Sequence, residues 1–197
     1  MLKLLPLIFI IACGACGPST VEFGTDTDKS VSIEPVEPYP WATWETCAHD
    51  IGDNPCNFEL MDQNGLQADL YQHYGKVILL DFSVMWCGPC NSIAPIGDIW
   101  TEAYGEDNFV WITVLIEDTT GGPVDLSDLQ AWTTTYSISG PVLASSRDMI
   151  DTTEPLEDGY PITAWPTIVM VDRTMRINNG MNGFNESTIQ TWIESLL

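Results

Sequence analysis

Basic residues are scarce in this chain of 197 residues. Six Lys and Arg stand against 28 Asp and Glu, for a formal net charge of -22, and no basic residue lies between Lys76 and Arg147. Such a surface repels phosphate backbones and anionic lipid headgroups, so nucleic acid is not expected as a partner. We interpret the acidity as favouring solubility in an extracytoplasmic setting, and an acidic face for a basic partner is the alternative.

Long hydrophobic runs are also missing. The apolar stretch from Leu4 to Ala12 is far too short to cross a bilayer, which takes about 20 helical residues, and it has the form of a signal-peptide core. The small and apolar residues before Cys13 resemble the lipobox of bacterial lipoproteins, and Cys16 is the alternative site. We expect residues 1–16 to be a lipoprotein-type signal peptide, with plain secretion as the alternative. The protein is then exported to the bacterial periplasm or cell envelope, held by an N-terminal lipid anchor.

Residues 17–46 form an acidic segment with four prolines and no sustained helical or strand period, which predicts a linker. The folded domain is expected over residues 47–197, and Trp41 and Trp44 suggest that the chain docks on it slightly earlier. Cys47 and Cys56 enclose eight residues. In an oxidising compartment this spacing favours a structural disulfide, and a metal site that also uses His49 is the alternative.

The domain alternates strand and helix patterns. Asn64-Gly65 predicts a hairpin turn, and the two long apolar runs predict strands buried on both faces. A helix is expected to continue through a kink at Pro95. Asp125 or Ser127 is expected to cap the next helix, and Asn185 or Ser187 is expected to cap the last one. We predict a hairpin near 57–71, strands at 77–84, 109–117, 140–145 and 165–172 with a hairpin partner at 174–180, and helices at 91–104, 125–136 and 185–197, with residues 147–160 as a loop. This order indicates an α/β sandwich with a mixed sheet.

The segment SVMWCGPCNSIAP carries the chemistry. A Cys-x-x-Cys spacing places Cys87 at the start of a helix and Cys90 one turn inside it. Unpaired N–H groups and the positive end of the helix dipole stabilise a thiolate there, so Cys87 is expected to be the attacking thiol. Cys90 is then positioned to resolve a mixed disulfide within the same molecule.

The run GKVILLDFSVMWCGPCNSIAP resembles the thioredoxin superfamily, and the preceding hairpin resembles its exported TlpA/ResA-type, AhpC/TSA-like redoxin branch. The resemblance implies a thioredoxin-like fold with a central mixed sheet, helices on both faces and an N-terminal β-hairpin extension. It implies that Cys87 is the nucleophile, that Cys90 is the resolving thiol and that Asp81 is the buried acid that takes a proton from it. Desolvation is expected to raise the pKa of that carboxyl.

The second family mark lies at Ala164-Trp165-Pro166-Thr167, where Pro166 resembles the cis-proline that faces the cysteine pair. Trp165 occupies a position where many members carry a smaller residue, and Gly183 resembles the glycine near the last turn. The segment from Glu117 to Tyr160 is longer than a minimal thioredoxin needs. The residues expected to contact substrate are Trp86, Gly88, Pro89, Trp165 and Pro166, and plain packing is an equal alternative for Trp86.

The pattern predicts an exported thiol:disulfide oxidoreductase that exchanges its dithiol with protein disulfides or dithiols. Gly-Pro between the cysteines resembles reducing family members, which requires a thiol electron donor that the sequence does not identify. No CxxCH haem site, Walker loop or G-x-G-x-x-G is found, so no cofactor beyond the Cys87–Cys90 pair and no metal are expected. A redoxin-type thiol peroxidase and a non-catalytic metal-binding or chaperone relative are the alternatives.

Overall fold

The computed structural model describes residues 39–150 and 159–197. The expected signal peptide, Cys13, Cys16 and the linker up to Pro38 lie outside the described residues. The compact unit begins at Tyr39, so the last eight residues of the predicted linker belong to it. Within the described part, no helix is long and apolar enough to cross a membrane.

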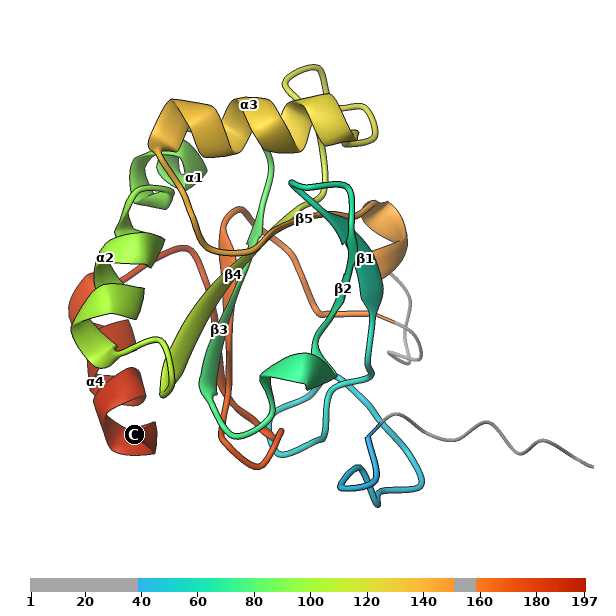
Figure 1. Cartoon of the computed structure of the whole chain (residues 1–197), viewed down its shortest axis with the longest axis vertical. Coiled ribbons are helices and arrows are strands. Elements are labelled where there is room, and N and C mark those ends of the chain that lie inside the picture. The colour runs from blue at the N-terminus through green and yellow to red at the C-terminus, as the bar shows by residue number, and fades with distance from the viewer. Residues whose placement is uncertain (1–38, 151–158) are drawn as a thin grey trace, which may run out of the picture. The chain divides into compact units, whose positions relative to one another are not determined.

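A single seven-stranded mixed sheet organises the domain (Figure 1), in the order β2-β1-β5-β4-β3-β6-β7. The neighbours β3 and β4, and β4 and β5, are parallel, whereas the other pairs are antiparallel. The strands are β1 (Glu59–Asp62), β2 (Gln67–Asp69), β3 (Val77–Ser83), β4 (Phe109–Leu115), β5 (Val142–Ala144), β6 (Thr167–Val171) and β7 (Ile177–Asn182). The predicted mixed sheet is confirmed, and the predicted hairpin extends it through β5.

Helices cover both faces of the sheet. They are α1 (Gly88–Ile93), α2 (Ile96–Tyr104), α3 (Leu126–Tyr136) and α4 (Glu186–Leu196), with short 3-10 turns η1 (Tyr71–His73) and η2 (Arg147–Met149). Figure 1 shows α3 apart from α2 and α4. Two buried clusters explain this arrangement, because α3 contributes Leu129 and Trp132 to one and α2 and α4 contribute Trp100 and Ile189 to the other.

Strand β3 separates these two clusters. All seven of its residues are buried. Ile78, Leu80 and Phe82 belong to the cluster beneath α3, whereas Val77 and Leu79 belong to the cluster beneath α2 and α4. Side chains alternate across a strand, so a continuous apolar run is what a strand covered on both faces requires. The central position of β3 fixes the place of the cysteine segment that follows it.

The helix expected through Pro95 is two helices, so that prediction was wrong in this detail. Helix α1 ends at Ile93, and α2 begins at Ile96 with Pro95 as its N-cap residue. Proline has no N–H to donate and its ring crowds the preceding turn, which favours a new helix start over a continuous kinked helix. For each of the other two helices, one of the two predicted caps is confirmed: Asp125 makes a capping box with Asp128 at the start of α3, and Asn185 caps α4.

Aromatic side chains attach the start of the unit to the domain. Trp41 stacks on Tyr74 with ring centroids 3.9 Å apart. Tyr39 donates from its hydroxyl to Asp69 at 2.6 Å, and the Trp44 indole donates to the Tyr71 hydroxyl at 3.1 Å. These contacts explain why the compact unit begins earlier than the predicted boundary at residue 47.

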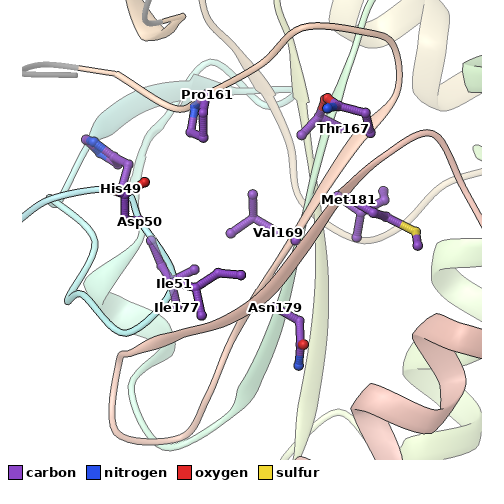
Figure 2. A pocket seen from close by; sticks show the side chains of 12 residues that line it. His49, Asp50, Ile51, Pro161, Thr167, Val169, Ile177, Asn179 and Met181 are labelled. Carbon is purple, nitrogen blue, oxygen red and sulfur yellow. The ribbon is translucent and has the colours of Figure 1, made fainter. Parts of the chain in front are cut away.

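Cys47 and Cys56 form a disulfide whose loop lies against the edge strand β7. Gly52 donates its N–H to the carbonyl of Ile177, and Ile177 donates its N–H to the carbonyl of Asp53. A pocket of about 240 Å³ lies between this loop and strands β6 and β7. Figure 2 shows the side chains that line it. The bonded sulfurs are not free thiolates, which argues against the alternative metal site at this loop.

Candidate redox site

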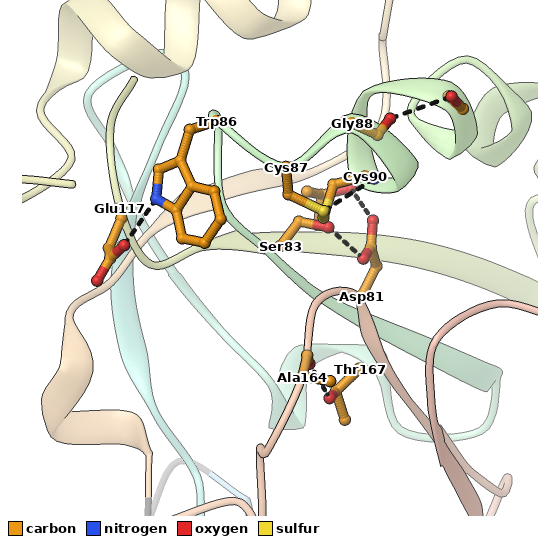
Figure 3. Close-up of a disulfide and its surroundings, with 11 residues drawn as sticks. Asp81, Ser83, Trp86, Cys87, Gly88, Cys90, Glu117, Ala164 and Thr167 are labelled. Atoms are coloured by element: carbon orange, nitrogen blue, oxygen red, sulfur yellow. Dashed lines mark hydrogen bonds between the residues drawn. A yellow bond between two sulfur atoms is a disulfide. The ribbon is translucent and has the colours of Figure 1, made fainter. Parts of the chain in front are cut away.

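Cys87 and Cys90 are joined in a disulfide directly after β3 (Figure 3). Cys87 is the N-cap residue of α1 with an extended backbone, and its sulfur accepts a hydrogen bond from the Cys90 N–H at 3.1 Å. Cys87 is 5% exposed and Cys90 is fully buried, whereas Gly88 and Pro89 between them are exposed. The structure therefore places the outer sulfur where an incoming group can approach it.

The N-terminal position of Cys87 has an electrostatic consequence for the reduced pair. The N–H groups of the first helical turn have no partners within the helix, and the Cys90 N–H points at the Cys87 sulfur. A negative charge on that sulfur is stabilised by this donor and by the adjacent helix end. The geometry favours a thiolate on Cys87 over one on the deeper Cys90.

Asp81 lies beneath the disulfide within β3 (Figure 3) and is 1% exposed. Ser83 donates its hydroxyl to the carboxylate at 2.6 Å, and Thr113 of β4 donates at 3.4 Å. Burial raises the pKa of Asp81 from 3.8 to about 6, and the hydroxyl donors oppose that rise. A carboxyl with this pKa can exchange protons near neutral pH.

The peptide bond between Trp165 and Pro166 is cis, as the family resemblance implies. Gly183 donates its N–H to the Pro166 carbonyl, and its φ of 84° is a backbone conformation that glycine adopts without a steric penalty. Thr167 donates its hydroxyl to the Ala164 carbonyl at 2.7 Å, which closes the turn. Figure 3 shows Ala164 and Thr167 on the segment that passes near Asp81 and the cysteines.

Two site residues were missed by the sequence reasoning. Ser83 is buried beside Asp81, and Glu117, just after β4, accepts a hydrogen bond from the Trp86 indole at 2.8 Å. Trp86 itself is 50% exposed. The available signals were a hydroxyl two residues after the buried acid and a carboxyl directly after a buried strand.

The described residues contain no group of three or more His, Cys, Asp or Glu side chains that could hold a metal ion. The disulfide between Cys87 and Cys90 and the buried carboxyl of Asp81 are groups that can support thiol–disulfide exchange.

Comparison with known sequences gives local similarity. No protein-family model matches the chain. Thioredoxin of Coprinus comatus is 44% identical over 43 residues, which are 22% of this chain and 41% of that protein. The matched region thus spans less than half the length of that relative.

Solved structures match a larger part of the chain. The thioredoxin domain of a thiol-disulfide oxidoreductase of Bacteroides vulgatus aligns over 74% of this chain and 99% of its own, with a TM-score of 0.59 and 18% identity. The exposed lipoprotein thioredoxin of Streptococcus pneumoniae aligns over 72% of this chain and 100% of its own, with a TM-score of 0.56 and 26% identity. These matches show that the domain has the thioredoxin-like fold.

Proposed function

We propose that this protein is a thiol:disulfide oxidoreductase that acts on protein disulfides. The observation that carries the proposal is the Cys87–Cys90 disulfide at the start of α1, directly above the buried carboxyl of Asp81. A low-pKa outer thiol, a resolving partner and a proton acceptor are the groups that disulfide exchange needs.

The reaction begins with the reduced pair. The Cys87 thiolate attacks one sulfur of a substrate disulfide, a mixed disulfide forms, and the other substrate sulfur leaves as a thiolate that takes a proton from solvent. Asp81 accepts the proton of the Cys90 thiol. The Cys90 thiolate then attacks the Cys87 sulfur and displaces the second substrate thiolate. The substrate gains two electrons, and the protein is left with the Cys87–Cys90 disulfide that the structure contains.

The segment around Pro166 supports a protein substrate over a small one through its family resemblance. It resembles the thioredoxin segment that faces the cysteine pair, where the backbone before the proline pairs with an extended peptide. Trp165, the residue before that proline, is partly exposed and Trp86 is half exposed, so both side chains offer apolar surface. We assign Trp86, Gly88, Pro89, Trp165 and Pro166 to substrate contact.

The direction and place of the reaction are further parts of the proposal. The Gly-Pro pair between the cysteines favours a reductase, which needs an external thiol donor to return the disulfide to the dithiol form. The signal-peptide and lipobox patterns at residues 1–16 favour export, with the domain tethered to a membrane through Cys13 or Cys16 and a linker.

The peroxidase alternative has less support. The resemblance to peroxiredoxins would require a proline and a threonine ahead of the reactive cysteine, and both are missing from the residues before Cys87. No turnover of hydrogen peroxide is therefore expected.

A trapping experiment tests the proposed function. Cys90→Ser leaves Cys87 able to attack but removes the thiol that releases the substrate, so mixed disulfides should accumulate on Cys87 when a denatured or disulfide-rich protein is added. The adducts are counted by non-reducing electrophoresis and mass spectrometry. The Cys87→Ser, Cys90→Ser double variant is the matched control. Equal adduct yields from the two variants would contradict the proposal.

A further inference from the structure

A carboxylate is buried next to the cysteine segment outside the exchange chemistry. Glu117 has a side chain that is 5% exposed, and one of its oxygens accepts the Trp86 indole N–H at 2.8 Å (Figure 3). Its backbone carbonyl also accepts the N–H of Met85 at 2.9 Å. Glu117 therefore contacts the segment before Cys87 at two points.

The other oxygen of the Glu117 carboxylate forms an ion pair with the guanidinium of Arg147. Arg147 is the first residue of η2, in the segment that follows β5, and its side chain is 66% exposed. Within residues 39–150 and 159–197 this is the only ion pair found. One of six basic residues in a strongly acidic chain thus lies against a buried acid beside the redox site.

A carboxylate removed from water requires compensating charge and hydrogen bonds. Here Arg147 supplies the charge, and the Trp86 indole supplies one hydrogen bond. Without the guanidinium, the buried position of the Glu117 side chain becomes unfavourable, and the side chain is expected to turn toward solvent. Trp86 would then lose its acceptor, and an indole that is 50% exposed would be free to change its orientation.

We propose that Arg147 is a positioning residue. Through Glu117 it fixes the orientation of the Trp86 ring, which then forms a contact surface for protein substrates beside Cys87. The inference rests on the proposed oxidoreductase function. A large substrate has to fit against the exposed Trp86 ring, whereas a small disulfide reaches the Cys87 sulfur without that contact. Arg147 should therefore affect the use of protein disulfides and leave the exchange chemistry unchanged.

The test compares two substrates in the full chain. Arg147→Met is expected to raise KM for insulin about five- to tenfold, the size of effect expected when one hydrogen-bonded contact is lost, with kcat within about twofold of wild type. The rate of Arg147→Met with a small aromatic disulfide should also stay within about twofold of the wild-type rate. The indole N–H signal of Trp86 in a ¹⁵N–¹H spectrum, assigned with Trp86→Phe, should shift in Arg147→Met and return toward its wild-type position in Arg147→Lys.

Arg176→Met is the matched control, because Arg176 is an exposed arginine that donates to the Gly52 carbonyl at the disulfide loop. It should leave both KM and the Trp86 signal unchanged. If Arg147→Met lowers the melting temperature strongly, Glu117→Leu serves as the second variant, because leucine cannot accept the Trp86 indole N–H, and it should raise KM in the same way. An unchanged insulin KM and an unchanged Trp86 signal in both variants would overturn the inference. Failure of wild type to react with either substrate would instead overturn the proposed function.

Discussion

Cys87→Ser is expected to bring insulin reduction down to the uncatalysed background, a loss of at least about three orders of magnitude. The outer sulfur is the one that α1 presents at its first turn, and Cys90 is fully buried behind it. A serine hydroxyl cannot attack a disulfide at neutral pH, so no mixed disulfide forms. The measurement is insulin turbidity or the release of substrate thiols with dithiothreitol as the donor.

The variant Cys47→Ala, Cys56→Ala provides the control for the loss of a disulfide as such. That loop lies against the edge strand β7, away from the helix start that carries Cys87. This double variant should retain the exchange rate of wild type, while its melting temperature falls. Wild-type turnover by Cys87→Ser, or loss of turnover only in the Cys47 and Cys56 variant, would mean that the redox pair is wrongly assigned.

Asp81→Asn is expected to slow turnover by about 10² to 10⁴ at neutral pH, the usual effect of removing a general base. The same variant should be more stable than wild type at pH 7.5. Burial raises the pKa of Asp81 from 3.8 to about 6, so the folded protein holds this proton more tightly than the unfolded chain does. The stability that the group contributes is complete below about pH 3.8 and is lost as the pH rises through about 6.

The size of this loss of folding stability follows from the shift in the pKa of Asp81. A change of about two pKa units corresponds to roughly 3 kcal/mol, and asparagine, which does not ionise, avoids it. The difference in unfolding free energy between Asp81→Asn and wild type, measured in urea, should therefore be larger at pH 7.5 than at pH 4. The comparison cancels the titration of the other carboxyls. An equal difference at both pH values, together with unchanged turnover, would exclude Asp81 as a buried proton acceptor.

Local patterns in the sequence predicted the parts of the fold that depend on local chemistry. The apolar run that becomes β3 reads as a strand covered on both faces, and Asp125 and Asn185 are side chains that cap helices by bonding to nearby N–H groups. The cis peptide at Pro166 was predicted from the family resemblance.

Contacts between distant segments could not be predicted in the same way. Arg147 and Glu117 are thirty positions apart, and nothing local to either residue indicates that the strands bring them together. The hydrogen bond from Tyr39 to Asp69 could not be predicted for the same reason, so the predicted start of the domain, residue 47, was too late. At Pro95 the proline itself was a visible local signal. Whether it kinks one helix or separates two depends on how α1 and α2 pack.

The pH dependence of alkylation at Cys87 in the reduced protein tests the central claim most directly. With iodoacetamide and mass spectrometry to assign the modified residue, Cys87 should react first, with an apparent pKa below the free value of about 8.5, while buried Cys90 stays unmodified in the folded protein. Faster reaction at Cys90, or an apparent pKa of about 8.5 or above at Cys87, would contradict the claim that the N-terminal end of α1 stabilises Cys87 as a reactive thiolate.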